Sequence, residues 1–196
     1  IPINQKEATN RQTNDRFSTN GSLQFNRKLN SKGRNIALRL YYNLDNGNSD
    51  RYSLANTYYL KYGDSIKVQN QWIDNLNRNH EYRVQLTYME PVFTNHFIEI
   101  NYSYQHRSSL SEKYAYDWND LEDSYSQYPD TAQSDCYKNK YSIHQVGAFF
   151  RTIRTNYFYN IGIEIEPQQT TNQSYMRDTT LEYSSRNAIN YAPTMN

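Results

Sequence analysis

Apolar and polar residues alternate along this chain with a period of two in six separate runs. Side chains of a β-strand point to opposite faces in turn, so this alternation predicts strands with one apolar and one polar face. In one run Val84 and Leu86 are separated by Gln85, and in another Ile161 and Ile163 are separated by Gly162. The runs predict strands at about 16–27, 34–44, 80–90, 96–107, 141–153 and 157–167.

The predicted strands are long. Each spans about nine to twelve residues, whereas strands of soluble proteins average about five or six. A tilted strand that crosses a lipid bilayer needs about nine to eleven residues. Strand length therefore favours a membrane barrel over a soluble sandwich.

The connections between the predicted strands alternate in length. Short connections at 28–33, 91–95 and 154–156 alternate with long polar stretches at 45–79, 108–140 and 168–196. In an antiparallel meander, all short connections then lie on one side of the sheet. Short periplasmic turns and long extracellular loops are typical of bacterial outer-membrane barrels. We therefore expect an all-β, antiparallel up-and-down meander that is part of a transmembrane β-barrel.

Aromatic residues support the same interpretation. They make up 15% of the chain, and 21 of them are tyrosines. Many fall near the ends of the predicted strands, as belts at two membrane–water interfaces would. The alternative is that they form cross-strand tyrosine pairs on a soluble sheet.

Composition excludes several functional classes. The formal net charge is +1, so no basic excess points to nucleic acid. The single cysteine, Cys136, rules out an intrachain disulfide. The four histidines are scattered, and neither a phosphate-binding glycine loop nor a nucleophile motif is present. We therefore expect a protein that is not an enzyme and has no cofactor.

Six strands are too few for a closed barrel, because the smallest bacterial barrels have about eight. Either weak strands lie within the long stretches, with 52–62 and 65–72 as the best candidates, or the chain is one piece of a larger barrel. Both ends of the sequence are polar and loop-like. We expect residues 1–196 to be an incomplete barrel segment.

Four short motifs, in this order along the chain, resemble a known family. They are Lys32-Gly33-Arg34-Asn35, Tyr88-Met89-Glu90-Pro91, the run from His96 to Tyr104, and Asn160-Ile161-Gly162-Ile163-Glu164. Together they are similar to the barrel portion of TonB-dependent receptors of Bacteroidota, the outer membrane protein β-barrel family. The resemblance covers about residues 18–168.

This resemblance implies an outer-membrane transporter that takes up a bulky nutrient such as a siderophore or a glycan. Its partners would be outer-membrane lipid, a plug domain of the same full-length chain and TonB, with a surface lipoprotein as an optional further partner. The sequence leaves two alternatives open: a soluble β-rich carbohydrate-binding module, and a plug-less surface barrel with an adhesive or structural role.

Two groups of residues are candidates for contact with solute. The aromatic side chains of one long stretch could stack on a flat ligand; they are Tyr114, Tyr116, Trp118, Tyr125 and Tyr128. Polar residues opposite the apolar parity are expected to face the lumen, where charges are tolerated; they are Arg39, Arg83, Glu99, Asn101 and Glu164.

A weak metal candidate lies in the same aromatic stretch. Closely spaced carboxylates can hold Ca²⁺, and four occur here: Asp117, Asp120, Glu122 and Asp123. The stretch lacks the glycine of a calcium-binding loop, and Tyr128 occupies the place of its bidentate glutamate. We therefore expect no metal site, with a solvated acidic loop as the simpler interpretation.

Overall fold

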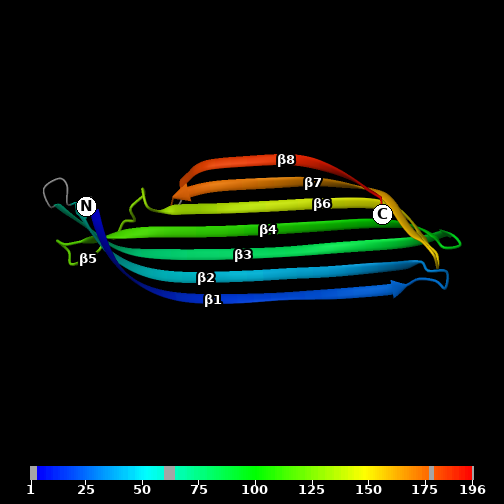
Figure 1. Cartoon of the computed structure of the whole chain (residues 1–196), viewed down its shortest axis with the longest axis horizontal. Helices are drawn as coiled ribbons and strands as arrows, with labels where there is room; N and C mark the ends of the chain where they lie inside the picture. Colours follow the sequence, from blue (N-terminus) through cyan, green and yellow to red (C-terminus); the bar gives the residue numbers. More distant parts are fainter. Residues whose placement is uncertain (1–3, 60–64, 177–178, 196) are drawn as a thin grey trace.

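The chain forms a single antiparallel sheet. The computed structural model describes residues 4–59, 65–176 and 179–195. The strands are β1 (Asn4–Lys28), β2 (Asn35–Tyr59), β3 (Ser65–Phe93), β4 (His96–Asn119), β5 (Ser124–Tyr125), β6 (Asp135–Ile153), β7 (Phe158–Met176) and β8 (Thr179–Met195). Seven of them lie side by side in chain order, and the short β5 pairs with β4 (Figure 1). The prediction of an all-β antiparallel meander is confirmed.

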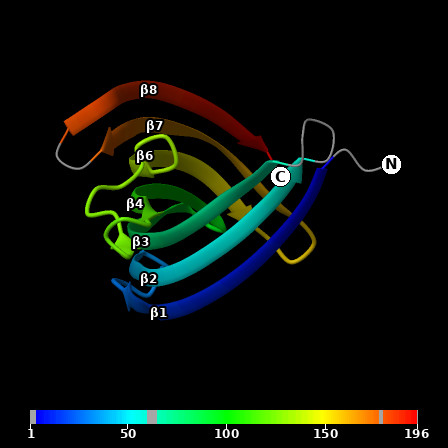
Figure 2. The same cartoon turned by 90° about the vertical axis from the view of Figure 1, so that its left-hand side faces the viewer.

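The sheet is curved and open. Viewed from one end, its strands follow an arc with β1 and β8 as the two margins (Figure 2). In the part of the chain that the structure describes, β1 pairs only with β2, and β8 pairs only with β7. The sheet is therefore not closed into a barrel by its own strands.

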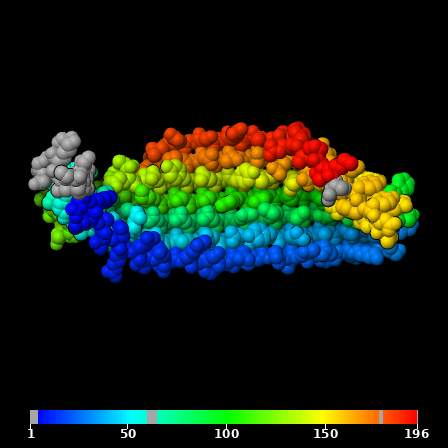
Figure 3. All heavy atoms as spheres, viewed as in Figure 1, coloured from blue at the N-terminus to red at the C-terminus, as the bar shows by residue number. Residues whose placement is uncertain are grey.

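The strands are much longer than the alternation predicted. The strand expected at 34–44 extends to Tyr59, and the strand expected at 80–90 begins at Ser65. The candidate weak strands are continuations of these two, with 52–59 in β2 and 65–72 in β3; residues 60–62 lie outside the described residues. The space-filling view shows the strands packed alongside one another over their length (Figure 3).

The expected long loops are corrected by the same observation. Strands occupy most of the described residues of 45–79, 108–140 and 168–196, and β8 lies entirely within the last of these. The reason is that both faces of these strand extensions carry many polar residues. An apolar–polar alternation cannot mark such a strand, although its backbone pairs as well as any other.

The short connections do lie together at one end of the sheet. They join β1 to β2, β3 to β4 and β6 to β7, and all three are at the right-hand end of Figure 1. At the opposite end, β2, β3 and β4 extend beyond β6, β7 and β8. We call these two ends the turn end and the distal end.

One face of the sheet carries a band of exposed apolar side chains near the turn end. Residues that pair across antiparallel strands lie on the same face of the sheet. The register therefore places the alternating apolar residues of all six predicted strands on one face. The apolar band comprises Phe17, Leu23, Phe25, Ile36, Leu38, Leu40, Tyr42, Leu44, Tyr82, Val84, Leu86, Ile98, Ile100, Tyr102, Val146, Phe150, Ile161, Ile163, Ile165, Ile189 and Tyr191. Most of these side chains are exposed; Leu23, for example, is 64% exposed.

The opposite face is polar and more crowded. Its residues include Glu99, which is 4% exposed, and Gln71, also 4% exposed. Side chains on the inside of a curved sheet converge, whereas those on the outside spread apart. The exposures therefore identify the polar face as the concave one and the apolar band as part of the convex one.

The apolar band runs obliquely across the strands. In β1 it is centred on Gly21, and the register leads from Gly21 through four strands to Gln169 in β7. The band in β7 is instead centred on Ile163. This displacement of six residues over five strand steps is about 1.2 residues per strand, which at roughly 3.3 Å per residue and 4.8 Å between strands corresponds to a slant of about 40°.

An ion pair joins the β1–β2 connection to the last part of β3 at the turn end. Gly33 has a φ of 104°, a conformation that favours glycine, and the side chain of Asn30 accepts hydrogen bonds from the backbone N–H groups of Lys32 and Arg34. The guanidinium of Arg34 then binds both carboxylate oxygens of Glu90, which also accepts a hydrogen bond from Tyr88. Two of the motifs that carry the family resemblance therefore contact each other.

Phe149 interrupts the apolar–polar alternation of the strand predicted at 141–153. It is an apolar residue on the polar face, yet it is only 7% exposed. Its ring lies over Gly147 in the same strand and over Gly162, its partner in β7. A Cβ atom built on Gly162 would lie 2.3 Å from the Phe149 ring and 2.5 Å from the backbone oxygen of Ala148.

We expect Gly162→Ala to lower the free energy of unfolding by about 1–3 kcal/mol, because the added methyl must displace the ring or the backbone. Gly47→Ala is the matched control, since a Cβ there meets nothing closer than 3.8 Å. Urea unfolding of the full-length protein, followed by tryptophan fluorescence, measures both. Equal stability of the two variants would contradict the packing of Phe149 on Gly162.

Candidate functional site

The five predicted lumen residues all lie on the concave polar face. Arg39, Arg83, Glu99, Asn101 and Glu164 have the parity opposite to the apolar band in β2, β3, β4 and β7. The register alone places them there, because paired residues share a face. That this face lines a lumen remains a prediction.

The best-defined group on this face is centred on Glu99. Two carboxylate–guanidinium contacts join Glu99 to Arg151 in the neighbouring strand β6, at 2.8 and 3.0 Å. The side-chain amide of Asn101 donates to the same carboxylate at 2.8 Å. The Glu99 side chain is only 5% exposed, so its charge depends on these partners instead of on water.

Several polar atoms around this ion pair have no protein partner. Among the described residues, Asn101 Oδ1, Arg151 Nε and Asn160 Oδ1 are buried without a hydrogen bond. The register aligns Arg151 with Asn160 and sets Asn101 two residues from Glu99. Buried polar atoms of this kind generally have partners. The cluster therefore offers both donor and acceptor groups to water, solute or another protein segment.

Further hydrogen bonds extend across the polar face. Arg83 donates to Gln105 at 2.8 Å, and Gln105 donates to Glu81 at 2.9 Å. Towards β7, Gln145 accepts from Ser103 at 3.1 Å and donates to Glu164 at 3.1 Å. Arg39 is more loosely held, by a 3.3 Å hydrogen bond to Gln24. The charges are thus held by neighbouring strands and form a polar lining.

The predicted aromatic site is brought together only in part. Tyr116 stacks on Trp72 with ring centroids 4.8 Å apart, and Trp118 meets Tyr125 edge to face at 5.1 Å. Tyr125 also contacts Tyr52 at 5.8 Å. These five rings form a cluster at the distal end that packs largely on itself.

The other two predicted aromatic residues lie elsewhere. Tyr114 is at the register position opposite Asp74, and Tyr128 is in the loop after β5, where it is 70% exposed. Trp72 and Tyr52 were missed because their segments were expected to be loop. Both residues have the same parity as the apolar residues of their strands, and this was the signal that could have found them. Polar residues on both faces of these segments obscured it.

The acidic residues of the weak metal candidate do not converge. Among the residues that the structure describes, no group of three or more His, Cys, Asp or Glu side chains could hold a metal ion. Asp117 instead accepts a hydrogen bond from the buried Gln71 at 2.7 Å. Asp117 and Asp120 line a hollow of about 350 Å³ together with Lys67, whose positive charge opposes metal binding.

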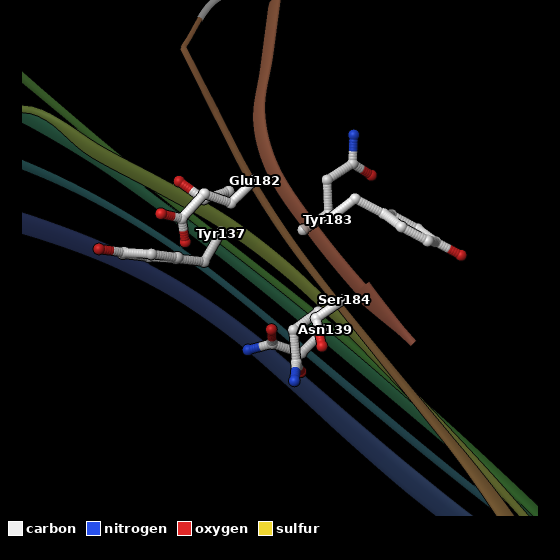
Figure 4. Close-up of a pocket in the computed structure, with 8 residues that line it drawn as sticks. Tyr137, Asn139, Glu182, Tyr183 and Ser184 are labelled. Atoms are coloured by element: carbon white, nitrogen blue, oxygen red, sulfur yellow. The ribbon is translucent and has the colours of Figure 1, made fainter. Parts of the chain in front are cut away.

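A second hollow, which the sequence did not indicate, lies near the distal ends of β6, β7 and β8. Its volume is about 420 Å³. Tyr137, Asn139, Glu182 and Ser184 line it from the polar face, whereas the Tyr183 ring points to the other side of β8 (Figure 4). A tyrosine, amides, hydroxyls and one carboxylate make it suited to a polar, uncharged or cationic solute.

The structure contains a carboxyl with a raised pKa on the convex face beyond the apolar band. Asp74 pairs directly with Asp50 in the β2–β3 register. Burial, followed by the negative charges of Asp50 and Glu112, raises the pKa of Asp74 above its ordinary value. Like charges placed opposite each other on paired strands are destabilising.

Comparison with family models, with curated proteins and with solved structures finds no match to this chain. In the described residues, no helix is long and apolar enough to cross a membrane. Function must therefore be inferred from the geometry of the sheet and from the motifs in the sequence.

We expect Glu99→Gln to lower the free energy of unfolding by about 2–4 kcal/mol, because Arg151 would lose its counter-charge in a largely buried place. Arg16→Gln is the control: it also breaks a bidentate ion pair, with Asp45, but the Arg16 side chain is 71% exposed. Its loss should change stability little. Urea unfolding of both variants of the full-length protein tests this, and equal effects would show that burial does not strengthen the Glu99 pair.

We expect Asp74→Asn to stabilise the protein at neutral pH. A carboxyl whose pKa is raised in the folded state contributes stability below its unfolded pKa, and this contribution is lost as the pH rises through the folded pKa. The gain in stability of Asp74→Asn over the unaltered protein should therefore shrink as the pH falls towards about 4. Thermal unfolding at both pH values measures it, with the exposed Asp15→Asn as control. A pH-independent difference would argue against repulsion at Asp74.

Proposed function

We propose that this chain is part of the outer-membrane β-barrel of a TonB-dependent transporter that takes up a bulky nutrient. The observation that carries the proposal is the oblique apolar band on the convex face. Strands of membrane barrels tilt by about 35–45°. A level band of lipid-facing residues would therefore cross such strands at a slant in this range, and the register gives about 40°.

The height of the band agrees with a bilayer. In β2 the band extends from Ile36 to Leu44, and nine residues span about 27–30 Å along a strand. Once the tilt is taken into account, this corresponds to about 20 Å across the membrane, near the roughly 25 Å apolar band of known barrels. A soluble sheet has no reason to expose so large an apolar surface.

The open margins of the sheet point to additional strands. Unpaired backbone groups in lipid cost several kcal/mol each, so β1 and β8 must both be paired within a membrane. In the proposed barrel, other strands of the full-length chain complete the wall. The polar face then lines a lumen, and the partnerless atoms around Glu99 face a plug domain or a passing solute.

The TonB-dependent class is supported by the motif resemblance. The Lys-Gly-Arg turn and the Tyr-Met-Glu-Pro step are far apart in sequence, but Arg34, Tyr88 and Glu90 form one contact group. We therefore expect the full-length gene to encode a plug domain before this segment. A full-length sequence without a plug would favour the surface barrel with an adhesive or structural role.

The first test is fractionation of cells that express the full-length protein. We expect recovery in the outer membrane, release only by detergent, and gel mobility that changes on heating. Recovery as a soluble monomer would overturn the proposal. The carbohydrate-binding module would then be favoured, and the hollow at Tyr137 and Glu182 would be its first candidate site.

Two neighbouring substitutions on β3 test the lipid-facing assignment. Leu86→Arg places a charge within the apolar band and should destabilise the membrane-inserted protein by about 2–4 kcal/mol. Gln85→Arg adds the same charge on the polar face and should be tolerated. Urea unfolding in phosphatidylcholine vesicles compares them, and tolerance of both arginines would contradict a lipid-facing Leu86.

A further inference from the structure

A hollow with basic walls lies on the convex face, directly beyond the apolar band. Its volume is about 580 Å³. Arg78 and His80 of β3 line one side, Lys138 of β6 lines the other, and Ser108 and Leu110 of β4 lie between them. All three basic side chains are exposed. We call this hollow the basic groove.

The register places further basic residues beside the groove. His80, Ser108 and Lys140 are aligned across β3, β4 and β6, and the next row towards the distal end aligns Arg78, Leu110 and Lys138. His106 lies one row closer to the band, with its ring 6.2 Å from that of His80. Arg78 of β3 and the two lysines of β6 therefore lie on either side of the same short stretch of β4.

No carboxylate opposes these charges in the same rows. Traced from β1 to β8, the three rows through His106, His80 and Arg78 contain no Asp or Glu among the described residues. The nearest row beyond them contains Asp15 of β1 and Glu112 of β4, and the Glu112 carboxylate accepts a hydrogen bond from Tyr175. The salt bridges that the structure describes include none to Arg78, Lys138 or Lys140. The groove is thus a local excess of positive charge.

The groove is continuous with the apolar band. Leu44, the last band residue of β2, also lines the groove, and on β3 the band ends at Tyr82, two residues from His80. If the band lies in lipid, as the proposed function holds, the groove lies at the level of the headgroups. Basic residues at that level attract anionic lipids by about 1 kcal/mol each.

We propose that the basic groove binds the phosphate of an anionic lipid headgroup in the outer leaflet. Arg78 and Lys138 are two strand spacings apart, about 10 Å, so both can reach a phosphate seated over Leu110. Arginine binds phosphate oxygens through two parallel N–H groups and lysine binds them as a point charge. The acyl chains of the same lipid lie along the apolar band, which a free phosphate ion would not use.

The test measures lipid binding to the purified full-length protein by native mass spectrometry in a non-ionic detergent. Phosphatidic acid is the probe, with phosphatidylcholine and inorganic phosphate as comparisons. The variant Arg78→Gln/Lys138→Gln/Lys140→Gln is compared with Arg107→Gln/Lys113→Gln/Arg186→Gln, which removes the same charge from the polar face. Heat-modifiable mobility shows that each variant is folded.

We expect the groove variant to bind phosphatidic acid at least about tenfold more weakly than the unaltered protein. The polar-face variant should bind it normally. Equal weakening in both variants, or none in either, would overturn the groove as the site. Inorganic phosphate binding as tightly as phosphatidic acid would overturn the lipid as its occupant.

This proposal rests on the proposed function, and the two can fail separately. A full-length protein that needs detergent for release but binds phosphatidic acid equally well without the groove cations would overturn only the lipid site. A full-length protein recovered without detergent would overturn the membrane barrel and the lipid site together.

Discussion

The structure depends on one antiparallel register that is maintained from β1 to β7. Because side chains alternate between the two faces, a slip of one residue between any two strands would move a whole apolar set to the polar side. The two register shifts, at Pro91/Phe93 and at Ser174/Tyr175, lie outside the apolar band. The band and the polar face are therefore both consequences of correct pairing near the turn end.

The same register explains how strands with two polar faces persist at the distal end. There the sheet is held by backbone hydrogen bonds between the strands and by hydrogen bonds between short polar side chains, such as Ser109 to Asn79 and Ser111 to Asn77. The aromatic cluster around Trp72 adds apolar contact where water would otherwise reach both faces. In the proposed barrel, this polar extension stands outside the membrane on the side of solute capture.

The two faces suit different partners. Charges on the concave face are neutralised by neighbours, as Glu99 is by Arg151, and this suits a hydrated interior that a solute can cross. On the convex face, the cations of the basic groove are exposed and lie next to apolar side chains. That combination suits a lipid, whose charged and apolar parts are adjacent in the same order.

The sequence by itself determined the class of fold and the faces of the turn-end strands. Alternation in segments such as 80–90 and 157–167 reports two different environments, and that difference is local information. The Lys-Gly-Arg turn could also be predicted from the sequence, because glycine is the residue that most readily adopts the positive φ found at Gly33. Phe149 broke the pattern, and no local rule could show that its ring covers a glycine of the next strand.

Only the tertiary structure decided how far the strands extend and which residues meet. Strand extensions such as 45–59 and 108–119 carry polar residues on both faces, so sequence periodicity gave only a weak signal there. Trp72 joined Tyr116, and Arg78 came to lie across β4 from Lys138, through pairing between residues far apart in the chain. Such pairings are set by the register of whole strands, which no single segment of the sequence specifies.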